Sequence, residues 1–293
     1  MRLLLLSIVA LAACGSSRSD SAAPTGRAND GGAGTPASGG GGDGGGAPIG
    51  DGGSGTADGG GAGVLSYRVG AAKVDITGPF AGSSTGYNDP GARMTGLAMR
   101  LYSRAFVIED PNADGRVVAI ATADLLHSYE SIKLGVVKKL AADGYGAALG
   151  DANVMVTGTH THSAPSNISW YSTYDGVNGV SGFDPVNYAI VVGGVARSIE
   201  EAYGARRPAV IRLVQGQLAG AAFNRAAPAY QANADASSYA TDVDETMTLL
   251  RVDGTDGAPI GAIDWFGVHG TSLGIDNRRE HGDNKGWAAY ALE

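Results

Sequence analysis

The hydrophobic pattern of the chain changes at about residue 64. Beyond that point, short segments rich in β-branched and aromatic residues alternate with longer segments of helical spacing. The strand-like segments lie at residues 67–77, 101–110, 116–124, 153–158, 209–217, 246–253 and 260–268. The third is apolar enough for a central strand, and the turn Pro111–Gly115 predicts that it forms a hairpin with the second.

Two segments have the spacing of helices. The first runs from Ser128 to Gly144, with Ser128 or Ser131 as its candidate N-cap, and the second runs from Asp184 to Gly204. Because these helices are interleaved with the strands, the sequence predicts an α/β fold with a mixed β-sheet core and flanking helices.

The first fourteen residues have the pattern of a secretory signal. One positive charge at Arg2 precedes an apolar run at residues 3–10, which is too short to span a bilayer as a helix. Leu-Ala-Ala then stands directly before Cys14, an ending that resembles a bacterial lipobox, in which cleavage leaves an acylated N-terminal cysteine. The alternative is a plain signal with an incidental cysteine. Cys14 is the only cysteine, so an exported form has no intramolecular disulfide to make.

Residues 15–63 consist almost entirely of glycine and other small side chains. Such a segment cannot bury enough apolar surface to offset the entropy lost on ordering, so we expect a disordered, glycine-rich tether. The chain thus divides into a lipoprotein signal (1–14), a linker (15–63) and a folded part (64–293). We expect an exported protein that is lipid-anchored to the bacterial cell envelope, at the outer membrane or cell surface.

Charge excludes one class of partner. The formal net charge is −8 and the isoelectric point is near 5.1, and no cluster of lysine or arginine is present to contact phosphates. A nucleic-acid partner is therefore not expected.

Histidines follow two of the predicted strands. His160 and His162 come just after the strand at 153–158, and residues two apart in an extended segment point the same way. His269 comes just after the strand at 260–268, and in open α/β sheets reactive groups gather where loops leave the carboxyl ends of strands. Imidazole suits zinc, and a catalytic zinc site needs about three protein ligands. The alternatives are hydrogen-bonded loop histidines at 160 and 162 and a core histidine at 269.

Two further segments carry polar side chains. Arg225 stands beside Asn224 in a loop, where its guanidinium could bind a hydroxyl or a carboxylate, or simply lie on the surface. Near the end of the chain, Glu280, His281 and Asp283 precede the start of a helix rich in alanine and aromatic residues. Asp283 could serve there as an N-cap.

Four of these segments, in order, resemble the neutral ceramidase family, whose members are zinc-dependent amidases that split ceramide into sphingosine and a fatty acid. The segments are VTGTHTHSAPS, FNRAAPAYQAN, FGVHGTSL and HGDNKGWAAYALE. The segment at 69–110, with its Gly86–Tyr87 turn, is similar to the start of that family's catalytic domain. The resemblance covers roughly residues 70–293.

The resemblance implies roles for individual residues. His160 and His269 correspond to zinc ligands of the family. His162 corresponds to a polar group that acts on the substrate, and Arg225 to a residue that contacts the substrate near the scissile amide. Gly86 corresponds to the position where the substrate headgroup is held.

The sequence also departs from the family pattern. A glutamate and a tyrosine that complete the zinc site, and a catalytic serine, all lie downstream of the Asp-Asn-Lys-Gly segment in the family, and this sequence contains no such motif. We therefore expect a truncated, N-terminal part of the catalytic domain with little activity on its own.

The resemblance predicts an enzyme that uses Zn2+ to hydrolyse the N-acyl bond of ceramide, held at a membrane surface by its lipid anchor. Two alternatives remain at this stage. One is a metal-dependent amidohydrolase of another family, built on a (β/α)8 barrel. The other is a surface lipoprotein that binds lipid without catalysis.

Overall fold

The computed structural model describes residues 4–8, 66–80, 86–87, 93–171 and 182–293. Cys14 and the segment 15–63 lie outside these residues, so the lipid anchor and the disordered tether stay predictions. No helix among the described residues is long and apolar enough to cross a membrane.

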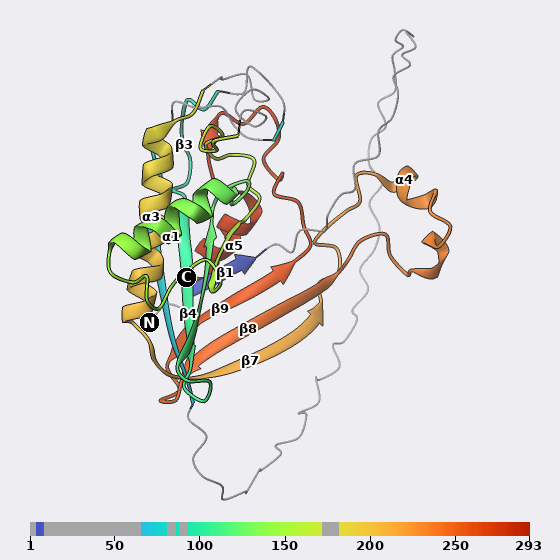
Figure 1. Cartoon of the computed structure of the whole chain (residues 1–293). Helices are drawn as coiled ribbons and strands as arrows, with labels where there is room; N and C mark the ends of the chain where they lie inside the picture. The colour runs from blue at the N-terminus through green and yellow to red at the C-terminus, as the bar shows by residue number, and fades with distance from the viewer. Residues whose placement is uncertain (1–3, 9–65, 81–85, 88–92, 172–181) are drawn as a thin grey trace, which may run out of the picture. The chain divides into compact units, whose positions relative to one another are not determined.

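The core of the fold is a mixed eight-stranded sheet with the order β1-β9-β8-β7-β2-β4-β5-β6 (Figure 1). Strands β5–β6 and β1–β9 pair in parallel, and the other neighbours pair antiparallel. The bounds are β1 Leu4–Ile8, β2 Tyr67–Asp75, β4 Tyr102–Asp110, β5 Arg116–Ala123, β6 Val154–Gly158, β7 Arg207–Gln217, β8 Thr246–Gly254 and β9 Pro259–Phe266. The predicted mixed α/β sheet is confirmed, and this order is not that of a (β/α)8 barrel, whose strands are all parallel.

The predicted hairpin is also confirmed. Strands β4 and β5 pair from Ser103↔Ala123 to Asp110↔Arg116. The turn between them has positive φ angles at Asp114 (56°) and Gly115 (69°), which are among the residues that tolerate this conformation best.

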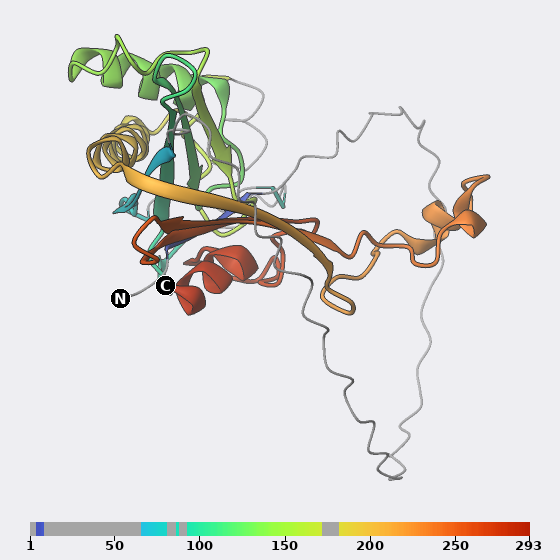
Figure 2. The same cartoon turned by 90° about the horizontal axis from the view of Figure 1, so that it is seen from below.

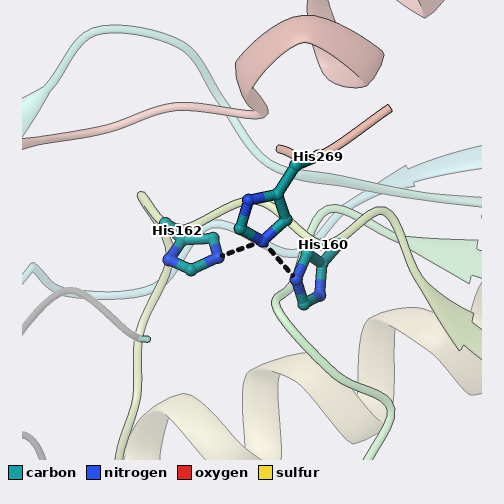
Figure 3. A group of neighbouring side chains, drawn as sticks. All are labelled: His160, His162 and His269. Atoms are coloured by element: carbon teal, nitrogen blue, oxygen red, sulfur yellow. Dashed lines mark hydrogen bonds between the residues drawn. The ribbon is translucent and has the colours of Figure 1, made fainter. Parts of the chain in front are cut away.

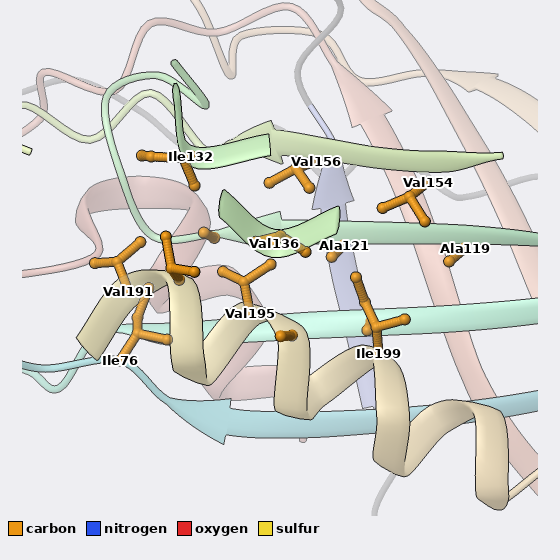
Figure 4. Close-up of a cluster of buried hydrophobic side chains, with 14 of the residues drawn as sticks. Ile76, Ala119, Ala121, Ile132, Val136, Val154, Val156, Val191, Val195 and Ile199 are labelled. Carbon is orange, nitrogen blue, oxygen red and sulfur yellow. The ribbon is translucent and has the colours of Figure 1, made fainter. Parts of the chain in front are cut away.

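Helices α1 (Glu130–Ala142) and α3 (Pro185–Gly204) lie side by side, and α3 packs on β2, β4 and β5 (Figures 1 and 2). The spacing of four residues between Val191, Val195 and Ile199 gives α3 one fully buried apolar stripe (Figure 4). The facing strand β5 presents Ala119, Ala121 and Ala123, whose small side chains let the helix approach closely.

The two helices begin differently. Asp184 is the N-cap of α3, and its carboxylate accepts hydrogen bonds from the amides of Val186 and Asn187, both at 3.0 Å. The predicted serine caps of α1 are wrong, because the N-cap is Tyr129, with no side-chain hydrogen bond. Ser131 already lies inside the helix, where its hydroxyl cannot cap the first turn.

Strand β1 lies within the segment predicted to be a signal peptide. It occupies the edge of the sheet beside β9, so the ladder from β9 to β6 is continuous without it. Cleavage of a signal peptide would leave seven strands, and the prediction of a signal peptide stays untested.

The remaining elements are a small second sheet, helix α5 and the elements of the β7–β8 connection. A small parallel pair joins β3 (Gly96–Leu97) to β10 (Arg279–Glu280), and α5 (Asp283–Leu292) follows β10 directly. The β7–β8 connection holds α4 (Ala227–Gln231) and a 3-10 turn, η1 (Ala236–Ser238), which extend away from the sheet (Figure 1).

A buried ion network ties the sheet to α5. Arg104 Nη1 lies 3.0 Å from Asp124 Oδ2, and Arg104 Nε lies 2.7 Å from Glu293 Oε1. Lys73 also pairs with Glu293. Because Arg104 is 2% and Asp124 is 0% exposed, each charge depends on its partner for compensation.

Candidate metal centre

The histidine-bearing loops come from strands far apart in the sheet order. His160 and His162 follow β6 at one edge, whereas His269 follows β9 near the other. The loops nevertheless meet, and the amide of His162 donates to the carbonyl of Gly270 at 3.3 Å. The expectation that both segments reach one site is borne out by this geometry.

The three imidazoles converge through their Nε2 atoms (Figure 3). His269 Nε2 lies 2.9 Å from His160 Nε2 and 3.2 Å from His162 Nε2. One ring nitrogen from each histidine lies within 4.8 Å of the others. Such convergence excludes the interpretation of His269 as an isolated core histidine, and His269 is exposed rather than buried.

His160 is held in an unusual backbone conformation. Its φ is +67°, in the left-handed region, which costs free energy for a non-glycine residue and occurs preferentially at functional sites. Its amide donates to the carbonyl of Leu125 at 2.9 Å, and its Nδ1 lies 3.2 Å from the carbonyl of Leu126. A proton on Nδ1 for this bond leaves the Nε2 lone pair facing the other histidines.

His269 has a comparable arrangement. Its Nδ1 lies 3.1 Å from the hydroxyl of Thr271, which directs Nε2 into the cluster. The next residue must be small, because a Cβ on Gly270 would lie 2.1 Å from the carbonyl oxygen of His160. Gly270 therefore allows the two histidine loops to approach.

His162 differs from the other two histidines. It is buried, and among the described residues its Nδ1 has no hydrogen-bond partner. The ring of Tyr87 lies 4.7 Å from its ring, centroid to centroid. Gly86, with a φ of +88°, lies against the same ring, since a Cβ there would be 2.5 Å from His162 Cε1. Gly86 thus lies at the site, beside His162.

The donor set fits a divalent transition metal. Two nitrogen ligands at 2.0–2.1 Å from a tetrahedral zinc ion are about 3.3 Å apart, close to the observed Nε2 separations. Partial burial lowers the pKa of His160 and of the more exposed His269, and burial together with the neighbouring histidines lowers the pKa of His162 to about 3. The imidazoles are therefore neutral at pH 7, the form that binds metal.

Arg225 is exposed on the surface, which was one of the two interpretations of its loop. It also borders the candidate site. It lines an open cleft of about 530 Å³ together with His269. Other residues that line the cleft are Phe223, Asn224, Asp242, Asp244, Thr271 and Ser272. The positive charge of Arg225 is near enough to contribute to the lowered pKa values of His162 and His269.

The expectation that Asp283 caps α5 is wrong. The N-cap is Gly282, and Asp283 is the first helical residue, with a φ of +54°. Its carboxylate instead accepts the amides of Ser272 at 3.0 Å and Leu273 at 3.1 Å. Asp283 is thus committed to the loop that carries His269.

His127, which the sequence pattern did not single out, is a fourth histidine beside the site. It follows β5, and its ring centroid lies 5.5 Å from that of His160. Burial lowers its pKa. The sequence signal for His127 was its position just after the strand-like segment at 116–124. In the structure this strand pairs in parallel with β6, and the carboxyl ends of parallel neighbours meet.

Residues 67–293 match the family described as neutral/alkaline non-lysosomal ceramidase, N-terminal. The chain is 37% identical over 229 residues to neutral ceramidase from Mycobacterium tuberculosis, a match that covers 77% of this chain and 35% of the relative. It is 36% identical over 230 residues to neutral ceramidase from Pseudomonas aeruginosa, covering 78% and 34%.

The fold is also similar to that of solved ceramidase structures. The crystal structure of neutral ceramidase from Pseudomonas aeruginosa superposes with a TM-score of 0.74 at 36% identity, covering 78% of this chain and 36% of that chain. A structure described as ceramidase complexed with C2 superposes with a TM-score of 0.73. The chain spans about a third of the length of these relatives.

Proposed function

Since the chain belongs to the neutral/alkaline non-lysosomal ceramidase family, we propose that it contributes a zinc centre to an amidase that hydrolyses the N-acyl bond of ceramide to sphingosine and fatty acid. The convergence of the three Nε2 atoms is the observation that carries the proposal. Family membership also argues against an amidohydrolase of another family.

Within this proposal His160 and His269 are the zinc ligands. Ligating histidines commonly bind a carbonyl, hydroxyl or carboxylate through the other ring nitrogen, and both residues have such a partner at Nδ1. His162 has no such partner among the described residues, and we assign it to the substrate instead. A zinc ion in such a site supplies Lewis acidity toward a water molecule or an amide carbonyl.

The surroundings of the histidines suit a lipid amide. Arg225 lies at the cleft, where its guanidinium can bind a hydroxyl or carbonyl oxygen of the substrate near the scissile amide. A second, mainly apolar pocket of about 260 Å³, lined by Leu218, Met247 and Phe266 among others, shares Val268 and Ser272 with the cleft. This pocket supports a substrate with an alkyl chain.

The test is turnover by the complete gene product. With a fluorescent ceramide we expect release of the fatty acid, loss of activity after chelation and recovery on addition of Zn2+. His269→Ala should abolish turnover, and Asn233→Ala in the α4–β8 connection should not. Ceramide binding without cleavage would favour the alternative of a lipid-binding surface lipoprotein, and activity that resists chelation would contradict the zinc centre.

We also propose that Cys14 is acylated and anchors the protein to the bacterial envelope. The Leu-Ala-Ala-Cys ending behind an apolar run supports this, and two or more acyl chains are needed for stable anchoring. Expression with labelled palmitate should label the protein, and label that persists in Cys14→Ala would contradict the proposal.

A further inference from the structure

Residues 281–285, here called the connector, run between the two histidine loops. On the side of His160 and His162, Thr161 Oγ1 donates to the carbonyl of His281 at 2.7 Å. The amide of His281 in turn donates to the carbonyl of Ser163 at 2.9 Å. Because Thr161 and Ser163 are buried, water cannot readily replace these bonds.

On the other side the connector holds the backbone around His269. Asn284 Nδ2 donates to the carbonyl of His269 itself at 2.7 Å, and the Lys285 ammonium donates to the carbonyl of Val268. The Asp283 carboxylate accepts the amides of Ser272 and Leu273. Three consecutive side chains therefore bind four backbone groups on both sides of one histidine.

The connector is itself firmly placed. Asp283 and Lys285 are 2% and 6% exposed. The amide of Asp283 donates to Nδ1 of His281 at 2.9 Å, which stabilises the left-handed conformation of Asp283. Gly282 packs closely against the next turn of α5, since a Cβ on it would lie 2.8 Å from the Cα of Gly286.

We propose that the connector is a positioning element that sets the distance between His269 and the pair His160 and His162. Among the described residues, the direct backbone link between the two loops is the bond of 3.3 Å from His162 to Gly270. The strands that carry the loops are not neighbours in the sheet, so the ladder does not fix this distance. The inference rests on the proposed zinc centre, whose affinity depends on how well the ligands are held before zinc binds.

The first test is the zinc affinity of the complete gene product, measured by competition with a chromogenic chelator. Asn284→Ala removes the bond to His269, and Thr161→Val removes the bond to His281 with little change in volume. Each variant should bind Zn2+ about 10-fold to 100-fold more weakly than the unsubstituted chain. Asn233→Ala is the matched control and should bind as the unsubstituted chain does. Thermal unfolding of the metal-free variants verifies that each is folded.

The second test needs no zinc. Asp283→Asn keeps the size of the side chain and tolerates the left-handed conformation, but it removes the charge that holds two amides. In the metal-free chain, hydrogen exchange at Ser272 and Leu273 should become at least about tenfold faster, while exchange in the β4–β5 hairpin stays unchanged.

The outcomes separate the two claims. Unchanged zinc affinity in both Asn284→Ala and Thr161→Val would overturn the positioning role, and so would unchanged exchange at Ser272 and Leu273. Failure of the unsubstituted complete gene product to bind Zn2+ would contradict the proposed metal centre, and the exchange measurement would then decide alone whether the connector holds the His269 loop.

Discussion

Glu280 should make the stability of the fold depend on pH in a direction unusual for a carboxylate. Its side chain is 1% exposed, and Oε2 has no hydrogen-bond partner among the described residues. Burial raises its pKa from an ordinary 4.5 to about 7. Between these values the folded state binds more protons than the unfolded state, so the free energy of unfolding falls as the pH rises.

The size of the effect follows from the two pKa values. Linkage between these two pKa values gives a loss of about 1 to 3 kcal/mol between pH 5 and pH 8. Glu280→Gln mimics the protonated acid and removes this loss. The variant should therefore gain stability over the unsubstituted chain at pH 8, and much less at pH 5.

Urea unfolding of both proteins at pH 5 and pH 8, followed by circular dichroism, measures this difference. Glu201→Gln on the exposed surface of α3 is the matched control, and its effect should be small and equal at the two pH values. An effect of Glu280→Gln that is the same at both pH values would refute the reasoning, as would a loss of stability at pH 8.

Two further substitutions test the packing around the site. Gly270→Ala places a Cβ 2.1 Å from the carbonyl of His160, so we expect zinc affinity by calorimetry to fall at least about tenfold, whereas Gly274→Ala, which meets open space among the described residues, should leave it unchanged. Arg104→Met leaves Asp124 buried without its partner and should lower the free energy of unfolding by about 3–5 kcal/mol. The control Arg197→Met, at an exposed arginine of α3, should change it by less than about 1 kcal/mol. A small effect at Arg104 would show that the ion pair is not needed.

Much of the fold follows from local pattern. The β4–β5 hairpin was predictable because a five-residue turn ending in Asp-Gly separates two apolar strands, and α3 because its apolar residues recur at helical spacing and stop at Gly204. The start of α1 was not predictable, because two serines near the boundary, Ser128 and Ser131, were equally suitable as N-caps. The structure begins the helix at Glu130 and uses neither as a cap.

The candidate site was partly predictable. The positions of His160 and His269 just after predicted strands suggested a common site. The sequence pattern does not give the order of the strands, so it could not show that loops from two distant strands meet. The connector was missed because Asn284 and Lys285 bind backbone carbonyls of residues 15 and 17 positions earlier. Carbonyls are present at every residue, so no residue type identifies these partners in advance.

The most direct test of the account is a comparison of zinc affinities among three variants. We expect His160→Ala and His269→Ala each to lose the metal, because each removes a proposed ligand whose Nδ1 is already held by a hydrogen bond. His162→Ala should keep most of the zinc, because the proposed function assigns His162 to the substrate and not to the metal. Metal analysis and calorimetry on purified variants of the complete gene product decide it: if His162→Ala empties the site as fully as His269→Ala does, the assignment of ligands is wrong.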